Sequence, residues 1–291
     1  MRSISTCLLA AAMLSLSAPA AQATGLLFSN TPSPLPGNLD SLGFEEASAS
    51  EVGDIVSLDG ATATFSLSSF VVTLSNWSIA SDFPGVGTPA GYNVDLTLNL
   101  YNVGAGNAVG ALLSTVSTTA SIDWRPEPDT TGACFGGDWL DASGNCWSGS
   151  LSQVTFNLGG LVAPKTLLWG LAFNTEHAGY TPTGSAGPVN GLKVALPNAP
   201  PNKGLDPLAD SIYWATTVAG FYSDGGVGGV GTFREDTNWS PVAPAAEIFG
   251  DPIIEQEPGP GVPVPEPTAL LLLGTGMIGV IRLRGRRAAR N

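Results

Sequence analysis

The sequence has few charged residues and little of what metal centres and most catalytic sites use. Only 12% of its 291 residues are charged, and 11 Lys and Arg stand against 24 Asp and Glu, a formal net charge of −13. It has one histidine and three cysteines. The shortage of helix-forming Glu, Lys and Arg argues against a helical bundle. The shortage of bases argues against a nucleic-acid partner, because binding phosphates requires a basic face.

Glycine, proline and alternating apolar residues are what the sequence has instead. It contains 37 Gly and 23 Pro, and its 43% of hydrophobic residues is enough for a large core. Residues 94–101 alternate apolar and polar, the pattern of a strand with one buried side. Further strand-like segments lie at 61–74, 112–124, 154–158, 166–173, 192–196 and 211–222. Together they predict an all-β fold, an antiparallel β-sandwich of jelly-roll type over residues 24–250, with Trp169 in its core.

The first 23 residues indicate a secretory signal peptide. Arg2 supplies the positive charge, residues 8–16 form a short apolar stretch, and Ala21-Gln22-Ala23 is a cleavage site for signal peptidase. We expect the mature chain to begin near Thr24. The alternative is an N-terminal membrane anchor, which the shortness of the apolar stretch disfavours.

A second targeting signal is predicted at the C-terminal end. A Pro-rich linker at residues 251–263 leads to the sequence Val264, Pro265, Glu266, Pro267. A single hydrophobic helix follows, a predicted transmembrane span at about residues 268–283. A basic cluster then ends the apolar stretch: Arg282, Arg284, Arg286 and Arg287. Such a cluster stays on the cytoplasmic side of a membrane, so we expect everything upstream to lie outside.

The order of these C-terminal elements resembles the PEP-CTERM sorting signal, over residues 264–291. The resemblance implies that an exosortase-type membrane transpeptidase cuts near Pro-Glu-Pro and releases or re-anchors the protein. Bacteria that make exopolysaccharide carry such signals on exported proteins, and so do some ice-binding proteins. A plain single-span anchor is the alternative, and it differs only in leaving the tail uncut. Segments 32–53 and 169–184 also resemble parts of a secreted bacterial β-sandwich module of unknown function.

Removing both targeting segments leaves a more acidic chain. Residues 24–265 contain five bases and 23 acids, a net charge of −18. Such a surface repels anionic phosphates and membranes. It suits a neutral polysaccharide, cations or simple solubility.

Two cysteines remain once the signal peptide has removed Cys7. Cys134 and Cys146 are an even pair in an exported chain, which predicts a disulfide. Closing a loop of this size stabilises a fold by about 3 kcal/mol. Zinc is disfavoured, because the chain has only one histidine. The one cofactor we consider is a structural calcium ion in this loop, with Asp138, Asp141 and Asn145 as candidate ligands, although their spacing is not that of an EF-hand.

Two tryptophans, Trp139 and Trp147, flank Cys146 in polar surroundings. If their rings are exposed, they are candidates for stacking on sugar rings, as in carbohydrate-binding modules. The alternative is that they pack over the disulfide, in a loop that has few aliphatic residues.

No residue is assigned a catalytic role. His177, the only histidine, is expected at a strand end, bonded to a neighbouring loop, and no G-x-S-x-G sequence accompanies it. Carboxylate pairs that a glycosidase would need occur at Asp138 and Asp141 or at Glu45 and Glu46. Loop acids in an acidic chain are usually solvated, so a hydrolase is the last of the alternatives.

The sequence therefore predicts a non-enzymatic exported protein of the cell envelope or extracellular matrix. We expect it to be anchored transiently by its C-terminal helix and processed by an exosortase-type system. The first alternative is a carbohydrate-binding module acting on exopolysaccharide, with Trp139 and Trp147 as the platform. A further alternative is an ice-binding or adhesive surface. The ligand, the oligomeric state and the exact cleavage site are not encoded in any pattern we recognise.

Overall fold

The computed structural model describes residues 24–254. In chain order its elements are β1 (Gly25–Ser29), β2 (Asp40–Gly43), α1 (Phe44–Ala47), β3 (Ala49–Ser57), β4 (Thr64–Asn76), η1 (Ala80–Asp82), β5 (Gly91–Val103), η2 (Ala105–Asn107), β6 (Val109–Asp123), β7 (Trp139–Leu140), β8 (Cys146–Trp147), β9 (Ser150–Pro164), β10 (Thr166–Ala172), η3 (Pro188–Gly191), β11 (Leu192–Leu196), β12 (Ser211–Thr216), η4 (Ala219–Phe221), β13 (Arg234–Thr237) and β14 (Ala246–Pro252). The signal peptide, the residues of the sorting signal and its predicted membrane helix lie outside this part of the chain.

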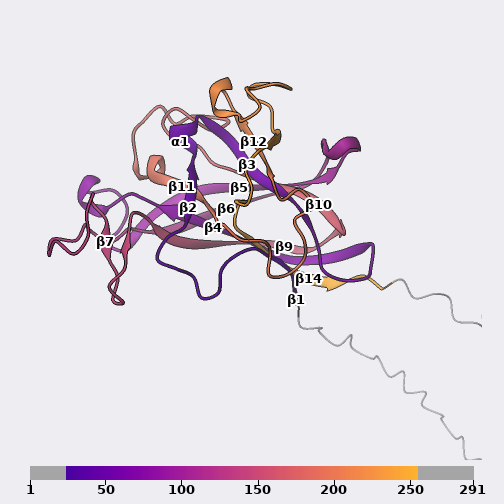
Figure 1. The fold of residues 1–291 in the computed structure, drawn as a ribbon, viewed down its shortest axis with the longest axis horizontal. Helices are drawn as coiled ribbons and strands as arrows, with labels where there is room; N and C mark the ends of the chain where they lie inside the picture. Colours follow the sequence, from indigo (N-terminus) through magenta and orange to yellow (C-terminus); the bar gives the residue numbers. More distant parts are fainter. Residues whose placement is uncertain (1–23, 255–291) are drawn as a thin grey trace, which may run out of the picture. The chain divides into compact units, whose positions relative to one another are not determined.

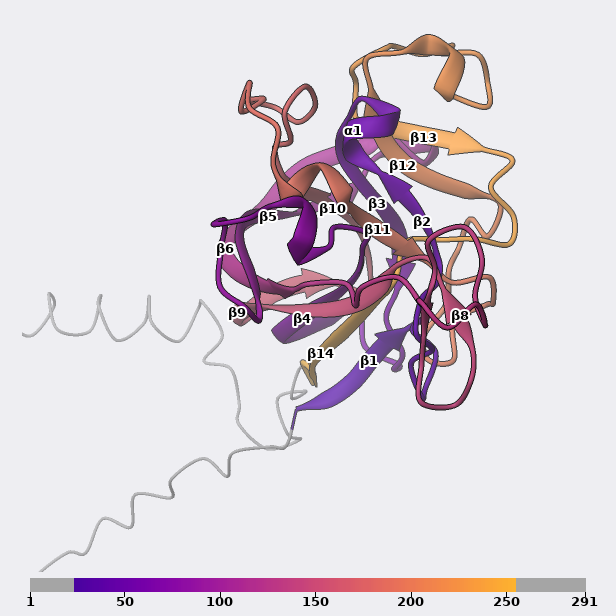
Figure 2. The same ribbon diagram turned by 90° about the vertical axis from the view of Figure 1, so that its left-hand side faces the viewer.

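Two antiparallel sheets of six strands each form the body of the fold (Figures 1 and 2). The first sheet has the order β1-β14-β4-β11-β2, and β9 pairs along the other side of β4. The second has the order β13-β12-β3-β10-β5-β6. The predicted all-β sandwich is thus confirmed.

The core lies between the two sheets and follows the alternation seen in the sequence. In β5 the side chains of Leu96, Leu98 and Leu100 are completely buried, each contributing about 1.5–3 kcal/mol through removal from water. Trp169 of β10 is also fully buried, as predicted, and its ring lies 5.1 Å from that of Phe70 in β4. This contact joins the two sheets.

The central strand β3 was not predicted. All nine of its residues are buried, so it does not show the alternation of a strand with one wet face. It also carries two acids, Glu51 and Asp54, which argue locally against a core strand. Strands β1, β2, β13 and β14 were missed as well, because they are short or irregular. The segment predicted as a strand over 211–222 ends as one at Thr216, and η4 follows.

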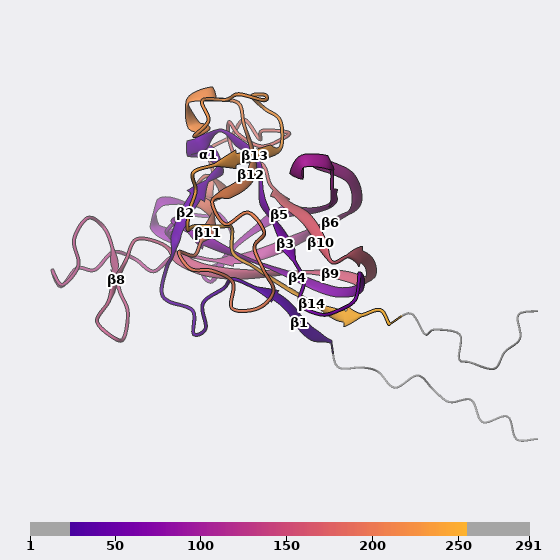
Figure 3. The same cartoon turned by 45° about the vertical axis from the view of Figure 1, so that its right-hand side comes forward.

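The two ends of the described chain lie together, at one end of strand β4. Gly25 pairs with Gly250, and Pro252 pairs with Phe65 near the beginning of β4. The other end of β4, at Asn76, pairs with β11 instead. Because β4 has 13 residues, its ends are about 40 Å apart. Figure 3 shows β1 and β14 leaving the sandwich on one side and the β7–β8 hairpin projecting on the other.

No helix within residues 24–254 has the length and apolar character needed to cross a membrane.

Candidate functional site

The loop between β6 and β9 is closed by a disulfide between Cys134 and Cys146, which confirms the predicted pairing. The Cα atoms are 5.6 Å apart. Inside the loop, β7 and β8 form a short hairpin in which Trp139 lies opposite Trp147. The loop projects from the sandwich, and the disulfide ties its two halves together.

Two aspartates hold this loop by accepting hydrogen bonds from its own N–H groups. Asp141 accepts from the backbone of Ser143 and Asn145, from the Asn145 side chain, and from Trp147 Nε1 at 2.8 Å. These bonds, that from Trp147 above all, lower the pKa of Asp141 to about 2. Asp129 accepts in the same way from residues 131, 133 and 134, and the bond from Cys134 is the main cause of its pKa of about 2.

Two of the three predicted calcium ligands, Asp141 and Asn145, make hydrogen bonds within the loop, and the calcium ion itself stays a prediction. Both oxygens of Asp141 already accept N–H groups, and Asn145 donates to Asp141. Within residues 24–254, one group of His, Cys, Asp or Glu side chains lies close enough to share a metal ion, and it does not include Asp138 or Asp141. The hydrogen bonds thus account for the order of the loop.

The two tryptophans of the hairpin differ in their surroundings. Trp139 is half-buried and donates from Nε1 to the carbonyl of Gly149 at 2.7 Å. Trp147 packs against the backbone of Gly37, where even a Cβ atom would lie 2.4 Å from its Nε1. Trp147 lines a groove on the surface, and Trp139 is not among the lining residues. The structure therefore places Trp147, and not Trp139, among the residues that line this groove.

The groove has a volume of about 720 Å³ and lies between the disulfide hairpin and the edge of the first sheet formed by β2 and β11. Its second aromatic wall is Trp77, which directly follows β4 and is 39% exposed. Polar side chains complete the lining: Asn38, Asp40, Ser41, Ser148, Lys193 and Asn198. We name this feature the Trp77–Trp147 groove. The sequence marks Trp77 only as one of seven tryptophans, since nothing local shows that it meets the hairpin.

Hydrogen bonds and one ion pair fix the walls of the groove. Trp77 donates from Nε1 to Ser75 Oγ at 3.0 Å, and Ser75 donates to Asn38 Oδ1 at 2.7 Å. The ammonium of Lys193 lies 2.7 Å from Glu46 Oε1 and 3.9 Å from the centre of the Trp77 ring. The Lys193 side chain is only 9% exposed. Its charge is therefore held in one place, at the wall of the groove.

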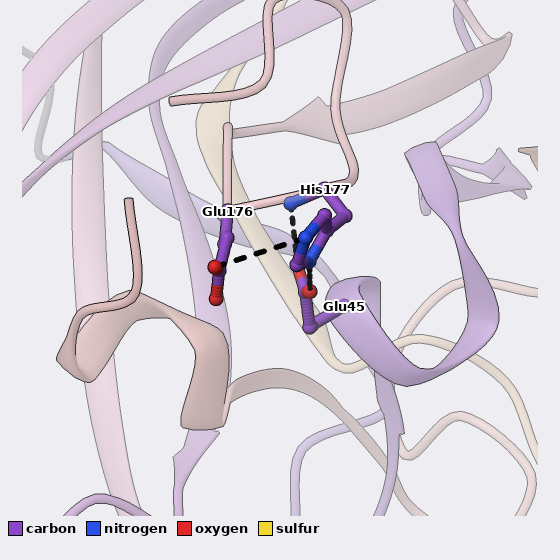
Figure 4. Close-up of side chains that lie close together, drawn as sticks. All are labelled: Glu45, Glu176 and His177. Atoms are coloured by element: carbon purple, nitrogen blue, oxygen red, sulfur yellow. Dashed lines mark hydrogen bonds and ion pairs between the residues drawn. The ribbon is translucent and has the colours of Figure 1, made fainter. Parts of the chain in front are cut away.

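A second cluster joins the sole histidine to two glutamates (Figure 4). His177 Nδ1 lies 2.6 Å from Glu45 Oε1, and its Nε2 lies 3.7 Å from Glu176 Oε1. Glu45 belongs to α1, whereas the other two residues follow β10. His177 lies in a loop five residues beyond the end of β10, its side chain is 73% exposed, and its partner belongs to a short helix. The expected position at a strand end and the expected bond to a neighbouring loop are therefore replaced by a contact between a loop and α1.

The electrostatics of this cluster favour a charged imidazolium. The hydrogen bond that the His177 ring donates to Glu45 is the main cause of a raised pKa for His177. Partial burial raises the pKa of Glu45, but hydrogen bonds from Thr175 and His177 outweigh it and lower the pKa overall. The three side chains are close enough to share a metal ion. However, the two ring nitrogens face different carboxylates, so the geometry suits a proton on each nitrogen better than three ligands around one ion.

Glu45 and Glu46, one of the two acid pairs considered for hydrolysis, have different partners. Glu45 binds His177, while Glu46 pairs with Lys193. Within residues 24–254, no serine hydroxyl is hydrogen-bonded to His177, so a Ser–His–Asp arrangement is not assembled there.

Comparison with known proteins identifies the C-terminal segment. Residues 263–287 match the family described as the PEP-CTERM protein-sorting motif. The match includes the sequence 264–267 and the arginines from 282 to 287, which confirms the resemblance that these residues carry. No curated protein matches the chain, and no solved structure matches it.

Proposed function

We propose that this chain, a PEP-CTERM domain-containing protein, is exported and cut by an exosortase-type transpeptidase, and that its sandwich is a non-enzymatic component of the cell envelope or extracellular matrix. The match over residues 263–287 carries the proposal. It combines a Pro-Glu-Pro sequence with an apolar stretch and an arginine cluster, the elements that a membrane-embedded processing enzyme would recognise.

The sandwich has features that are typical of extracellular proteins. The disulfide between Cys134 and Cys146 is of a kind that persists in oxidising compartments. The excess of acids over bases in the mature chain favours solubility. Among the acids considered for catalysis, Asp141 organises its loop and Glu46 pairs with Lys193. Ice binding or adhesion stays an untested alternative.

The sorting step is tested by changing the Pro-Glu-Pro residues. We expect the triple substitution Pro265→Ala, Glu266→Ala and Pro267→Ala to leave the tail attached, because the extended, proline-bounded segment is lost. Intact-mass measurement on the surface and membrane fractions should then show the full tail on the variant and a shorter mature chain in the wild type.

The matched control is Pro258→Ala, Gly259→Ala and Pro260→Ala, three changes in the linker outside the family match. This control should be processed like the wild type. An unchanged mature mass in the Pro-Glu-Pro variant would refute exosortase-type processing.

A further inference from the structure

The geometry points to a ligand for the sandwich: the Trp77–Trp147 groove binds a segment of a neutral oligosaccharide or polysaccharide. This inference goes beyond sorting, and it does not depend on whether the tail is cut. It rests on two fixed aromatic walls, a row of hydroxyl-binding side chains and the charge of the groove.

The aromatic walls are held in place before any ligand arrives. Trp77 is fixed by its bond to Ser75, and Trp147 by its bond to Asp141 and its packing on Gly37. A rigid tryptophan offers a large apolar face with little conformational freedom to lose on binding. The C–H face of a pyranose ring is apolar and flat enough to pack on such a face. At Trp77 this is the face opposite the Lys193 ammonium, which lies 3.9 Å from the ring centre.

The polar lining matches the hydroxyl groups of a sugar. Asn38 and Asn198 offer both donors and acceptors, Asp40 offers acceptors, and Ser41 and Ser148 offer hydroxyls. Sites for small ligands usually combine apolar walls with a few convergent polar groups. Lys193 adds a nearly buried ammonium, and Glu46 accepts only one of its three hydrogens.

The charges favour a neutral ligand. Lys193 is the one cation among the lining residues, and it is paired with Glu46. Asp40 adds a negative charge to the same surface. The mature chain as a whole is acidic, so an anionic polysaccharide such as a polyuronate would be repelled.

The position of the groove also suits an extended ligand. It is open to the surface beside the Asn76 end of β4, whereas the chain leaves toward its linker near the Thr64 end. Because the groove is open to the surface, a ligand can extend beyond it.

The experiment uses the mature exported protein, purified with its disulfide formed. It is titrated with neutral hexasaccharides of glucose, mannose, xylose and galactose, and with hexagalacturonate as an acidic probe. Tryptophan fluorescence and calorimetry follow the binding. We expect saturable binding of at least one neutral hexasaccharide. Trp77→Ala and Trp147→Ala should each weaken that binding by about tenfold or more.

Matched variants separate loss of binding from loss of folding. Phe135→Ala removes an aromatic residue of the same loop that is 85% exposed and does not line the groove, so it should bind like the wild type. Asp40→Ala and Asn198→Ala change exposed lining residues that belong to no core, and each should weaken binding several-fold. The proposal is overturned if no neutral hexasaccharide binds saturably, if hexagalacturonate binds as well, or if the four groove variants bind normally. None of these outcomes alters the mature mass that tests sorting.

Discussion

Several residues surround one buried carboxylate of the second sheet, that of Glu51. Glu51 of β3 is fully buried and accepts hydrogen bonds from Asn99 Nδ2 at 2.9 Å, from Tyr101 and from Tyr180. Burial raises its pKa, although these donors counteract the shift. Three donors meet the need of a buried carboxyl group for partners. Opposite them, Gly170 leaves the space that the carboxyl group occupies.

That space predicts the effect of enlarging Gly170. A Cβ atom at this position would lie 2.2 Å from Glu51 Oε1, so Gly170→Ala must displace the carboxyl group and its donors. We expect the free energy of unfolding to fall by about 1–3 kcal/mol. Chemical denaturation of the mature protein measures it. The control is Gly220→Ala, where the new methyl group meets no atom within 4 Å and the change should stay within about 0.5 kcal/mol. Equal stability of the two variants would contradict this account.

A second prediction concerns the protonation of His177, the only histidine and therefore an unambiguous signal in NMR. Its pKa should lie above the ordinary value of 6.5, chiefly because the protonated ring donates a hydrogen bond to Glu45. Glu45→Gln should bring the pKa back toward that value. The control Glu46→Gln should not, because Glu46 pairs with Lys193 instead.

The sign of the pH dependence follows from the two shifts. The raised pKa of His177 stabilises the folded chain below the pKa of the unfolded chain, and this contribution is lost as pH rises through the folded pKa. The lowered pKa of Glu45 stabilises above the unfolded pKa, and this contribution is lost as pH falls through the folded one. The contact between Glu45 and His177 thus stabilises the folded chain at pH values between the folded-state pKa of Glu45 and that of His177. If the pKa of His177 is the same in Glu45→Gln as in the wild type, the proposed pairing of His177 with Glu45 is excluded.

Among the elements, the loop of residues 129–147 behaves as a small unit attached to the sandwich. Its β7–β8 ladder has only two residue pairs, so strand pairing alone is too weak to order it. The disulfide and the N–H bonds to Asp129 and Asp141 supply the remaining order. The core of the sandwich, by contrast, draws on residues from both sheets and from no residue of this hairpin.

This division predicts a local effect of removing the disulfide. In the double variant Cys134→Ser and Cys146→Ser, the loop should lose about 3 kcal/mol of stabilisation. Hydrogen exchange should then quicken over residues 134–147 and stay unchanged in β5 and β10. Quickened exchange in those two core strands would mean that the loop supports the whole sandwich. Binding of a hexasaccharide should weaken in the same variant, since Trp147 belongs to the hairpin.

At the scale of the whole molecule, the end of the last strand, β14, and the Trp77–Trp147 groove lie near opposite ends of strand β4. The last strand ends beside the beginning of β4, and the Trp77–Trp147 groove lies beside the end of β4, about 40 Å away. The net negative charge of the mature chain favours solubility and disfavours anionic ligands.

The sequence by itself determined the features that are encoded locally. The Pro-Glu-Pro sequence with its apolar stretch and arginines is contiguous, and the family match confirms it. The alternation in residues 94–101 indicates a strand with one buried face. The two cysteines that remain in the mature chain can form only one disulfide with each other. Trp147 was among the predicted binding residues because its neighbours in the chain are polar.

Only the tertiary structure decided which distant residues meet. Glu45 and His177 are 132 positions apart, and Lys193 and Glu46 are 147 apart. Strand β3 is buried on both faces, so its pattern has no period from which to recognise it. The groove depends on sheet topology, because β4 and β11 bring Trp77 and Lys193 together and the disulfide loop places Trp147 opposite them. Contacts of this kind depend on strand order and register, which no short stretch of sequence encodes.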